Sequence, residues 1–133
     1  MPYEEIEPKI KNLVETFNEV GFETHASCQG HRMCLGKASA PYIAFRTDNQ
    51  QKLCAFAKLI SDDQMLMQPN LFWVWKIEPC FNCDFKIDYR LTMSSAYRWR
   101  TRFSRNRIDK DFQTIGNLLK NLTMVDYKLF DEC

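Results

Sequence analysis

Both histidines of the chain lie in the stretch Thr24-His25-Ala26-Ser27-Cys28-Gln29-Gly30-His31. Cys28 and His31 stand at C-x-x-H spacing, so they can bind one metal ion or pair as a thiolate and a base. Gly30 permits a sharp turn that brings backbone N–H groups and the ring of His31 to one point, where a phosphate or carboxylate could bind. The structural alternative is a turn in which Ser27 and His31 hydrogen-bond to the backbone and Cys28 is buried.

Cys80-Phe81-Asn82-Cys83 is a C-x-x-C motif between two predicted strands, the geometry of a zinc knuckle. A complete site needs four ligands, and the sequence has no second C-x-x-C. The predicted metal ligands are Cys28, His31, Cys80 and Cys83, with His25 and Cys34 as the other available partners. The alternative is two unlinked thiols in a turn. A redox role is disfavoured, because a thioredoxin-like motif opens a helix.

Residues 98–107 contain five arginines in ten positions and no acidic residue. In an extended conformation Arg98, Arg100 and Arg102 would share one face of the segment. Guanidinium groups bind phosphate through paired hydrogen bonds, and nearby aromatic rings stack on bases. The segment therefore predicts an anionic partner: nucleic acid, a nucleotide or an acidic protein surface. The alternative is a solvated basic face that pairs with the N-terminal glutamates.

Motifs typical of enzymes are weak in this sequence. It contains no glycine-rich phosphate loop, no nucleophile elbow and no H-E-x-x-H motif. A His–Cys pair is available in the first loop, but only Asp84 and Asp88 offer themselves as the carboxylate that orients it. A binding protein is therefore favoured over an enzyme.

The length of the chain and the distribution of its charges indicate a single domain with an acidic N-terminal part and a basic part later in the chain. The 133 residues are expected to form one domain, residues 1–133. Residues 1–23 carry six Glu and two Lys, whereas residues 84–110 carry eight Lys or Arg and three Asp.

No apolar run is long enough for a membrane span, and the acidic N-terminus does not resemble a signal peptide. We therefore expect a cytoplasmic protein without a membrane partner, whose six cysteines are thiols or metal ligands.

Apolar residues at helical spacing predict a helix over residues 4–20, ended by Gly21, and a last helix over residues 108–122. A middle helix is expected to begin at Asp48 as N-cap, with Gln51 in capping-box position. Two acids suit the positive N-terminus of the last helix, Asp109 and Asp111.

Strands are predicted at residues 22–27, 41–46, 71–77 and 85–91, and the last two are expected to pair as an antiparallel hairpin. Residues 32–40 are predicted to form a loop. The resulting fold class is α+β: a mostly antiparallel sheet of three to five strands with about three helices packed on one face.

Residues 10–46 carry a resemblance to known proteins. A helix is followed by Gly-Phe-x-Thr, then Ser-Cys-Gln-Gly-His, then Pro-Tyr-Ile-Ala-Phe. This pattern resembles small phage-encoded proteins with a Ser-Cys-x-Gly-His signature. It is similar, more distantly, to the Thr-x-Ser-Ser-Cys-Ser-Gly-Arg segment of the tRNA wybutosine-synthesising family. The resemblance implies an accessory or counter-defence role and a functional loop at Ser27, Cys28, Gly30 and His31, where His31 replaces the arginine of the tRNA family.

Three functions follow as hypotheses. The first is a non-enzymatic phage protein that sequesters a nucleotide-like or phosphate-bearing immune messenger, with Trp73, Trp75, Tyr97 or Trp99 stacked on its base. The second is an anti-CRISPR-type inhibitor of a host nucleic-acid-targeting complex, stapled by zinc. The third is a nucleic-acid-modifying enzyme. A homodimer could complete the pocket. The predicted ligand-binding residues are Ser27, Cys28, Gly30, His31, Arg90, Arg98, Trp99, Arg100 and Arg102.

Overall fold

The computed structural model describes residues 6–34, 37–81, 84–93 and 105–122. Four strands form one antiparallel sheet in the order β1-β4-β6-β5, and β2 and β3 form a separate two-stranded hairpin. The elements in chain order are α1 (Lys11–Glu19), β1 (Glu23–Cys28), β2 (His31–Cys34), β3 (Lys37–Ser39), β4 (Tyr42–Arg46), α2 (Gln50–Gln64), β5 (Trp75–Phe81), β6 (Ile87–Met93) and α3 (Arg105–Leu122).

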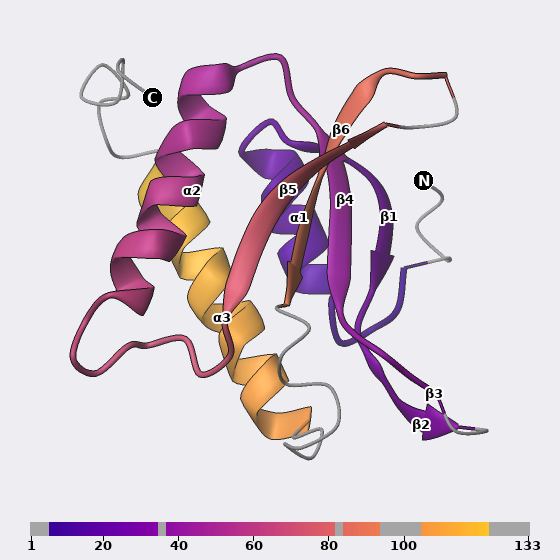
Figure 1. Ribbon diagram of the computed structural model, residues 1–133, viewed down its shortest axis with the longest axis vertical. Coiled ribbons are helices and arrows are strands. Elements are labelled where there is room, and N and C mark those ends of the chain that lie inside the picture. Colours follow the sequence, from indigo (N-terminus) through magenta and orange to yellow (C-terminus); the bar gives the residue numbers. More distant parts are fainter. Residues whose placement is uncertain (1–5, 35–36, 82–83, 94–104, 123–133) are drawn as a thin grey trace.

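The three helices pack against one face of the four-stranded sheet (Figure 1). Side chains alternate along the central strands, so that Ile43 and Phe45 of β4 and Leu91 of β6 are buried under the helices. The other face, which we call the outer face, carries mainly polar side chains. The predicted α+β class, with an antiparallel sheet and three helices on one face, is confirmed.

Four phenylalanines form the centre of the core. Phe17 of α1 lies between Phe45 of β4 and Phe56 of α2, with ring centroids 5.2 and 5.6 Å away. Phe22, which precedes β1, contacts the same three rings. All four side chains are fully buried. Tilted and edge-on aromatic contacts of this kind join the sheet to two of its helices.

Several element boundaries differ from the predicted ones. The first helix begins at Lys11 rather than at residue 4, although Ile6 and Ile10 are still buried. Gly21 follows the helix at φ +96°, which confirms it as the terminating glycine. The N-cap of α2 is Asn49 and not Asp48, because the side chain of Asn49 accepts the Lys52 N–H.

The strands differ more than the helices. The predicted loop 32–40 contains the β2–β3 hairpin. The hairpin of β5 and β6 is confirmed, but β5 begins at Trp75 and continues through Cys80 to Phe81, where a turn was predicted. Phe85, expected inside the alternating strand, stands before it at φ +60° with 84% of its surface exposed.

Two buried carboxylates hold the segment that leads into β5. Asp63 of α2 accepts hydrogen bonds from the N–H groups of Asn70 and Leu71. Asp111 of α3 accepts the N–H groups of Phe72 and Trp73 and the indole Nε1–H of Trp75. Asp111 is fully buried, so it is a tertiary anchor rather than the exposed helix-dipole partner that its position in the sequence suggests.

Gly116 lies in the interior of α3, where it faces α1. A methyl group at this position would meet only Leu13 Cδ1, at 3.8 Å, which is ordinary van der Waals contact. Glycine in a helix interior costs about 0.5–1 kcal/mol relative to alanine. We therefore expect Gly116→Ala to raise the free energy of unfolding by that amount, measured by urea denaturation. A decrease would show that α1 and α3 cannot accommodate the added methyl group.

Candidate functional site

The turn after β1 is held by the segment before α1. The Gln29 N–H donates to a carboxylate oxygen of Glu7 at 3.0 Å, and Gln29 Oε1 accepts the Lys9 N–H at 2.9 Å. Gly30, at φ +88°, donates its N–H to Cys28 Sγ at 3.4 Å. Two of the backbone donors that we expected to receive an anion therefore already have acceptors within the chain. An anion at this turn would compete with Glu7.

The remaining residues of this turn are placed as follows. Cys28 is buried. Ser27 faces the helices, where its hydroxyl is buried without a hydrogen-bond partner among the described residues. His31 begins β2, but its side chain lies outside the described part of the structure. The role of Ser27, Cys28, Gly30 and His31 in ligand binding stays a prediction.

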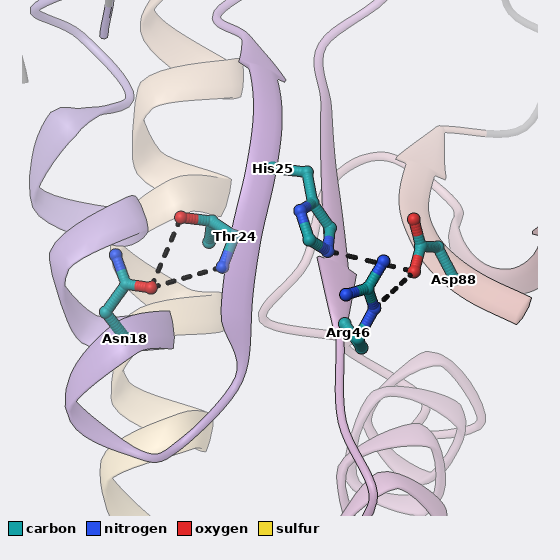
Figure 2. A network of polar contacts seen from close by, with 5 residues as sticks. All are labelled: Asn18, Thr24, His25, Arg46 and Asp88. Atoms are coloured by element: carbon teal, nitrogen blue, oxygen red, sulfur yellow. Dashed lines mark hydrogen bonds and ion pairs between the residues drawn. The ribbon is translucent and has the colours of Figure 1, made fainter. Parts of the chain in front are cut away.

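A β-bulge in β1 decides which residues share the outer face. Thr24 pairs with Phe45, but Ala26 pairs with Ala44, so His25 is an extra residue in β1. Asn18 Oδ1 accepts both the N–H and the hydroxyl of Thr24 at 3.2 Å and holds it on the helix side (Figure 2). Beyond the bulge the alternation is shifted, so that Cys28 rather than Ser27 lies on the same face as Tyr42.

The outer face brings a predicted ligand-binding residue, Arg90, against an aromatic ring. Arg90 of β6 is exposed, and its guanidinium carbon lies 4.5 Å from the ring centroid of Tyr42. Tyr42 pairs with Cys28 on one side and with Thr92 on the other. Arg90 itself pairs with the small Ala44 on one side and with Glu78 of β5 on the other. The sheet therefore places Cys28, at the start of the turn, on the strand next to the Tyr42–Arg90 contact, and a shared binding site stays a prediction.

A second polar group on the outer face contains Asp88, one of the two carboxylates expected to be available to orient a histidine, but its contacts with Arg46 and His25 were not predicted. Asp88, whose side chain is only 9% exposed, accepts Arg46 Nε at 3.0 Å, and its Oδ1 lies 3.7 Å from His25 Nε2 (Figure 2). His25 Nε2 is buried and has no hydrogen-bond partner among the described residues. The alternation of residues 41–46 and 85–91 indicates that Arg46 and Asp88 point outward. Their contact depends on the pairing of β4 with β6, which no local pattern reveals.

The predicted zinc site that joins the two cysteine motifs is not formed by Cys28 and Cys80. Cys28 ends β1 beside Tyr42, whereas Cys80 pairs with Asp88 near the far end of β5, and β1 and β5 are the two edge strands. Two strands separate them, and zinc–sulfur bonds are about 2.3 Å long. Among the described side chains no group of three or more His, Cys, Asp or Glu could hold a metal ion. Cys83 lies outside the described residues, and zinc bound at either motif alone stays a prediction.

The predicted stacking residues are placed differently from our expectation. Trp73 and Trp75 are 6% and 2% exposed and belong to the core, so they are unable to stack on a base. That part of the prediction is wrong, because both indoles pack inward toward the helices. The described residues do not include the other predicted members of this set, which are Tyr97, Arg98, Trp99, Arg100 and Arg102. The segment that contains them connects the end of β6 at Met93 to the start of α3 at Arg105.

No protein-family model, curated protein or solved structure matches this chain. The likeness of residues 10–46 to phage proteins and to the tRNA family therefore stays a prediction. Among the helices of the described residues, none combines the length and apolar character needed to cross a membrane.

Proposed function

We propose that this protein is a non-enzymatic binding protein that captures a nucleotide-like, phosphate-bearing ligand on the outer face of its sheet. One observation carries the proposal: the exposed Arg90 guanidinium stacked 4.5 Å from the Tyr42 ring. Stacking on the ring limits the orientations of the guanidinium plane, so its N–H edges are arranged for paired hydrogen bonds to a phosphate. The free face of the guanidinium can then receive a base.

The surroundings of Arg90 support an anionic ligand. Ala26 and Ala44 pair next to Arg90 and offer little steric hindrance. The two acids nearest to Arg90 each have another cation beside them: Asp88 is buried and accepts Arg46, and Glu78, which pairs with Arg90 across the strands, lies 3.4 Å from Lys76 Nζ. In the sequence, the arginine-rich segment follows directly after β6, which carries Arg90 and ends at Met93.

The biological role that we attach to this binding is counter-defence: a phage protein that sequesters a nucleotide messenger of the host. The resemblance of residues 10–46 supports the role, and the stacked Arg90 supports the ligand chemistry. Sequestration requires binding and no reaction. It therefore agrees with an arginine–aromatic contact more directly than an enzymatic function does.

Arg90→Ala tests this function. We expect at least a tenfold loss of affinity, about 1.4 kcal/mol, because a charge-assisted contact and its stacking surface are lost together. Isothermal titration with mononucleotides and cyclic nucleotides measures the affinity. Arg90→Lys should lose part of it, since lysine keeps the charge without the planar fork.

Lys58→Ala is the matched control for the loss of one exposed positive charge. Lys58 lies on α2, in the helix layer, and pairs with Asp62. The Lys58→Ala protein should bind every nucleotide with the same affinity as the wild type. If a nucleotide binds the wild type and Arg90→Ala with equal affinity, the outer face is not the binding site.

A second candidate function is an inhibitor that binds a host protein, and one observation favours it. The free end of the β5–β6 hairpin carries three exposed apolar side chains: Phe81 (71% exposed), Phe85 (84%) and Ile87 (52%). Clustered exposed apolar side chains mark protein-binding surfaces. Under this function the nucleotide titration gives no binding, and the hairpin end contacts the partner.

A further inference from the structure

A groove of about 400 Å³ lies between the segment that leads into β5 and the N-terminal half of α3. Its wall carries Phe72, which is 49% exposed. The guanidinium carbon of Arg107 lies 4.0 Å from the centroid of the Phe72 ring. Lys110, one turn further along α3, is also exposed and lines the groove. The groove thus combines an aromatic ring with two cations.

The wall of this groove is rigidly held. Asp111 accepts the backbone N–H groups of Phe72 and Trp73 at 2.8 and 2.9 Å. Asp63 accepts those of Asn70 and Leu71 at 3.2 and 2.9 Å. Four consecutive backbone donors are therefore fixed by two buried carboxylates. A surface that is ordered before binding loses less conformational entropy when a ligand arrives.

The groove lies at the same end of the sheet as the Arg90 site. Trp75, the first residue of β5, pairs with Met93, and Tyr42 pairs with the neighbouring Thr92. Figure 1 shows the start of β5, the end of β6 and the N-terminal half of α3 together at this end of the molecule. Two arginine–aromatic pairs, Arg90 with Tyr42 and Arg107 with Phe72, are thus present at one end of the fold.

We infer that the ligand is a single-stranded nucleic acid, and that the groove at Phe72 and Arg107 is a second position where one of its bases stacks. This inference rests on the proposed function and specifies its ligand. Arg90 and Tyr42 lie on the outer face of the sheet, whereas Phe72 and Arg107 lie on the side of helix α3, so one base cannot stack on both arginines. A strand of several nucleotides can place one base on each pair.

The charges favour a nucleic acid strand over a mononucleotide. Arg90, Arg107 and Lys110 are exposed cations at this end, and a polyanion that contacts several cations gains affinity from the release of its counterions. Base stacking on aromatic and guanidinium planes tolerates any sequence. The site is therefore expected to bind single strands with little sequence preference.

The experiment measures fluorescence anisotropy of fluorescein-labelled oligo-dT and oligo-U of about ten nucleotides, a typical footprint for such sites. Each probe is titrated with wild type, Phe72→Ala, Arg107→Ala and Arg90→Ala. Val74→Ala is the control, because Val74 is an exposed apolar residue, 60% exposed, two positions after Phe72. All variants change exposed side chains, and circular dichroism verifies their fold.

We expect Phe72→Ala and Arg107→Ala each to weaken oligonucleotide binding at least tenfold, with Val74→Ala unchanged. Arg107→Ala should also reduce the slope of log K against log salt concentration by about one. Mononucleotides should compete only weakly with the oligonucleotide. This combination supports both stacking positions and the strand as ligand.

The other outcomes separate the inference from the proposed function. If oligonucleotides bind and only Arg90→Ala weakens them, the outer-face site stands and the second stacking position is wrong. If mononucleotides bind the wild type and oligonucleotides bind no more tightly, the proposed function stands and the strand is the wrong ligand. If neither class of probe binds, both are wrong.

Discussion

Replacing Asp111 with alanine is expected to lower the free energy of unfolding by about 3–5 kcal/mol. Its carboxylate accepts three hydrogen bonds, from Phe72 N, Trp73 N and Trp75 Nε1, at 2.8, 2.9 and 2.8 Å. Alanine would leave these two backbone donors and one indole donor without their acceptor. The segment before β5 would also lose its connection to α3. Urea denaturation of both proteins measures the difference.

Asp62→Ala is the matched control for Asp111→Ala. Asp62 is an exposed acid on α2 that pairs only with Lys58 four residues earlier in the contacts described here. Exposed pairs of this kind contribute about 0.3–0.5 kcal/mol. If the two alanine variants lose similar amounts of stability, the buried carboxylate is not the anchor that its hydrogen bonds indicate.

Measuring stability at several pH values separates the effect of the charge on Asp111 from the effect of its hydrogen bonds. Burial raises the pKa of Asp111 above its ordinary value of 3.8, against the opposing effect of its bonds from Trp75, Phe72 and Trp73. The folded chain then holds this proton more tightly than the unfolded chain does. The part of the stability that comes from protonation of Asp111 is therefore complete below pH 3.8 and is lost as the pH rises through the raised pKa. Asp111→Asn, which does not titrate, should lack this component of the pH dependence.

Phe17→Ala is expected to cost about 3–5 kcal/mol, the usual penalty for removing a buried aromatic ring. Phe17 has no exposed surface and contacts the rings of Phe22, Phe45 and Phe56. Because these rings come from both layers of the fold, the cavity cannot close by the movement of a single side chain. Chemical denaturation followed by tryptophan fluorescence gives the change.

Phe85→Ala is the control for Phe17→Ala, because it removes the same ring from a position that is 84% exposed. It should change the free energy of unfolding by no more than about 0.5 kcal/mol. A loss at Phe17 no greater than the loss at Phe85 would show that the core is not organised around this ring.

Periodicity in the sequence identified the elements that have one buried face. Helical spacing correctly predicts buried side chains in two helices: Val14 and Phe17 in α1, and Ile115 and Leu119 in α3. The same rule gave the wrong start for the first helix, since Ile6 and Ile10 are buried from a turn rather than from a helix. It also extended the strand pattern to Phe85, because alternation alone does not show where a hairpin passes beyond the helices that cover it.

The residues of the proposed site were predictable only where local sequence determines them. Arg90 was identified because it lies on the polar side of an alternating strand. Its contact with Tyr42, and that of Asp88 with Arg46, depend on the pairing of strands about 45 residues apart in sequence. Trp73 was assigned to a ligand by its residue type, but the anchors Asp63 and Asp111 hold its segment against the core.

The sheet order divides the chain into two parts, each of which contains an antiparallel strand pair followed by a helix. One half is the pair β1 and β4 followed by α2, and the other is the pair β5 and β6 followed by α3. They meet along β4 and β6 and are linked through residues 65–69, where Met67 is fully exposed. If two molecules exchanged their second halves, the β4–β6 ladder and the bonds from Asp63 to Leu71 would re-form between chains. Such an exchange would keep the β4–β6 pairing and would require residues 65–69 to follow a different path.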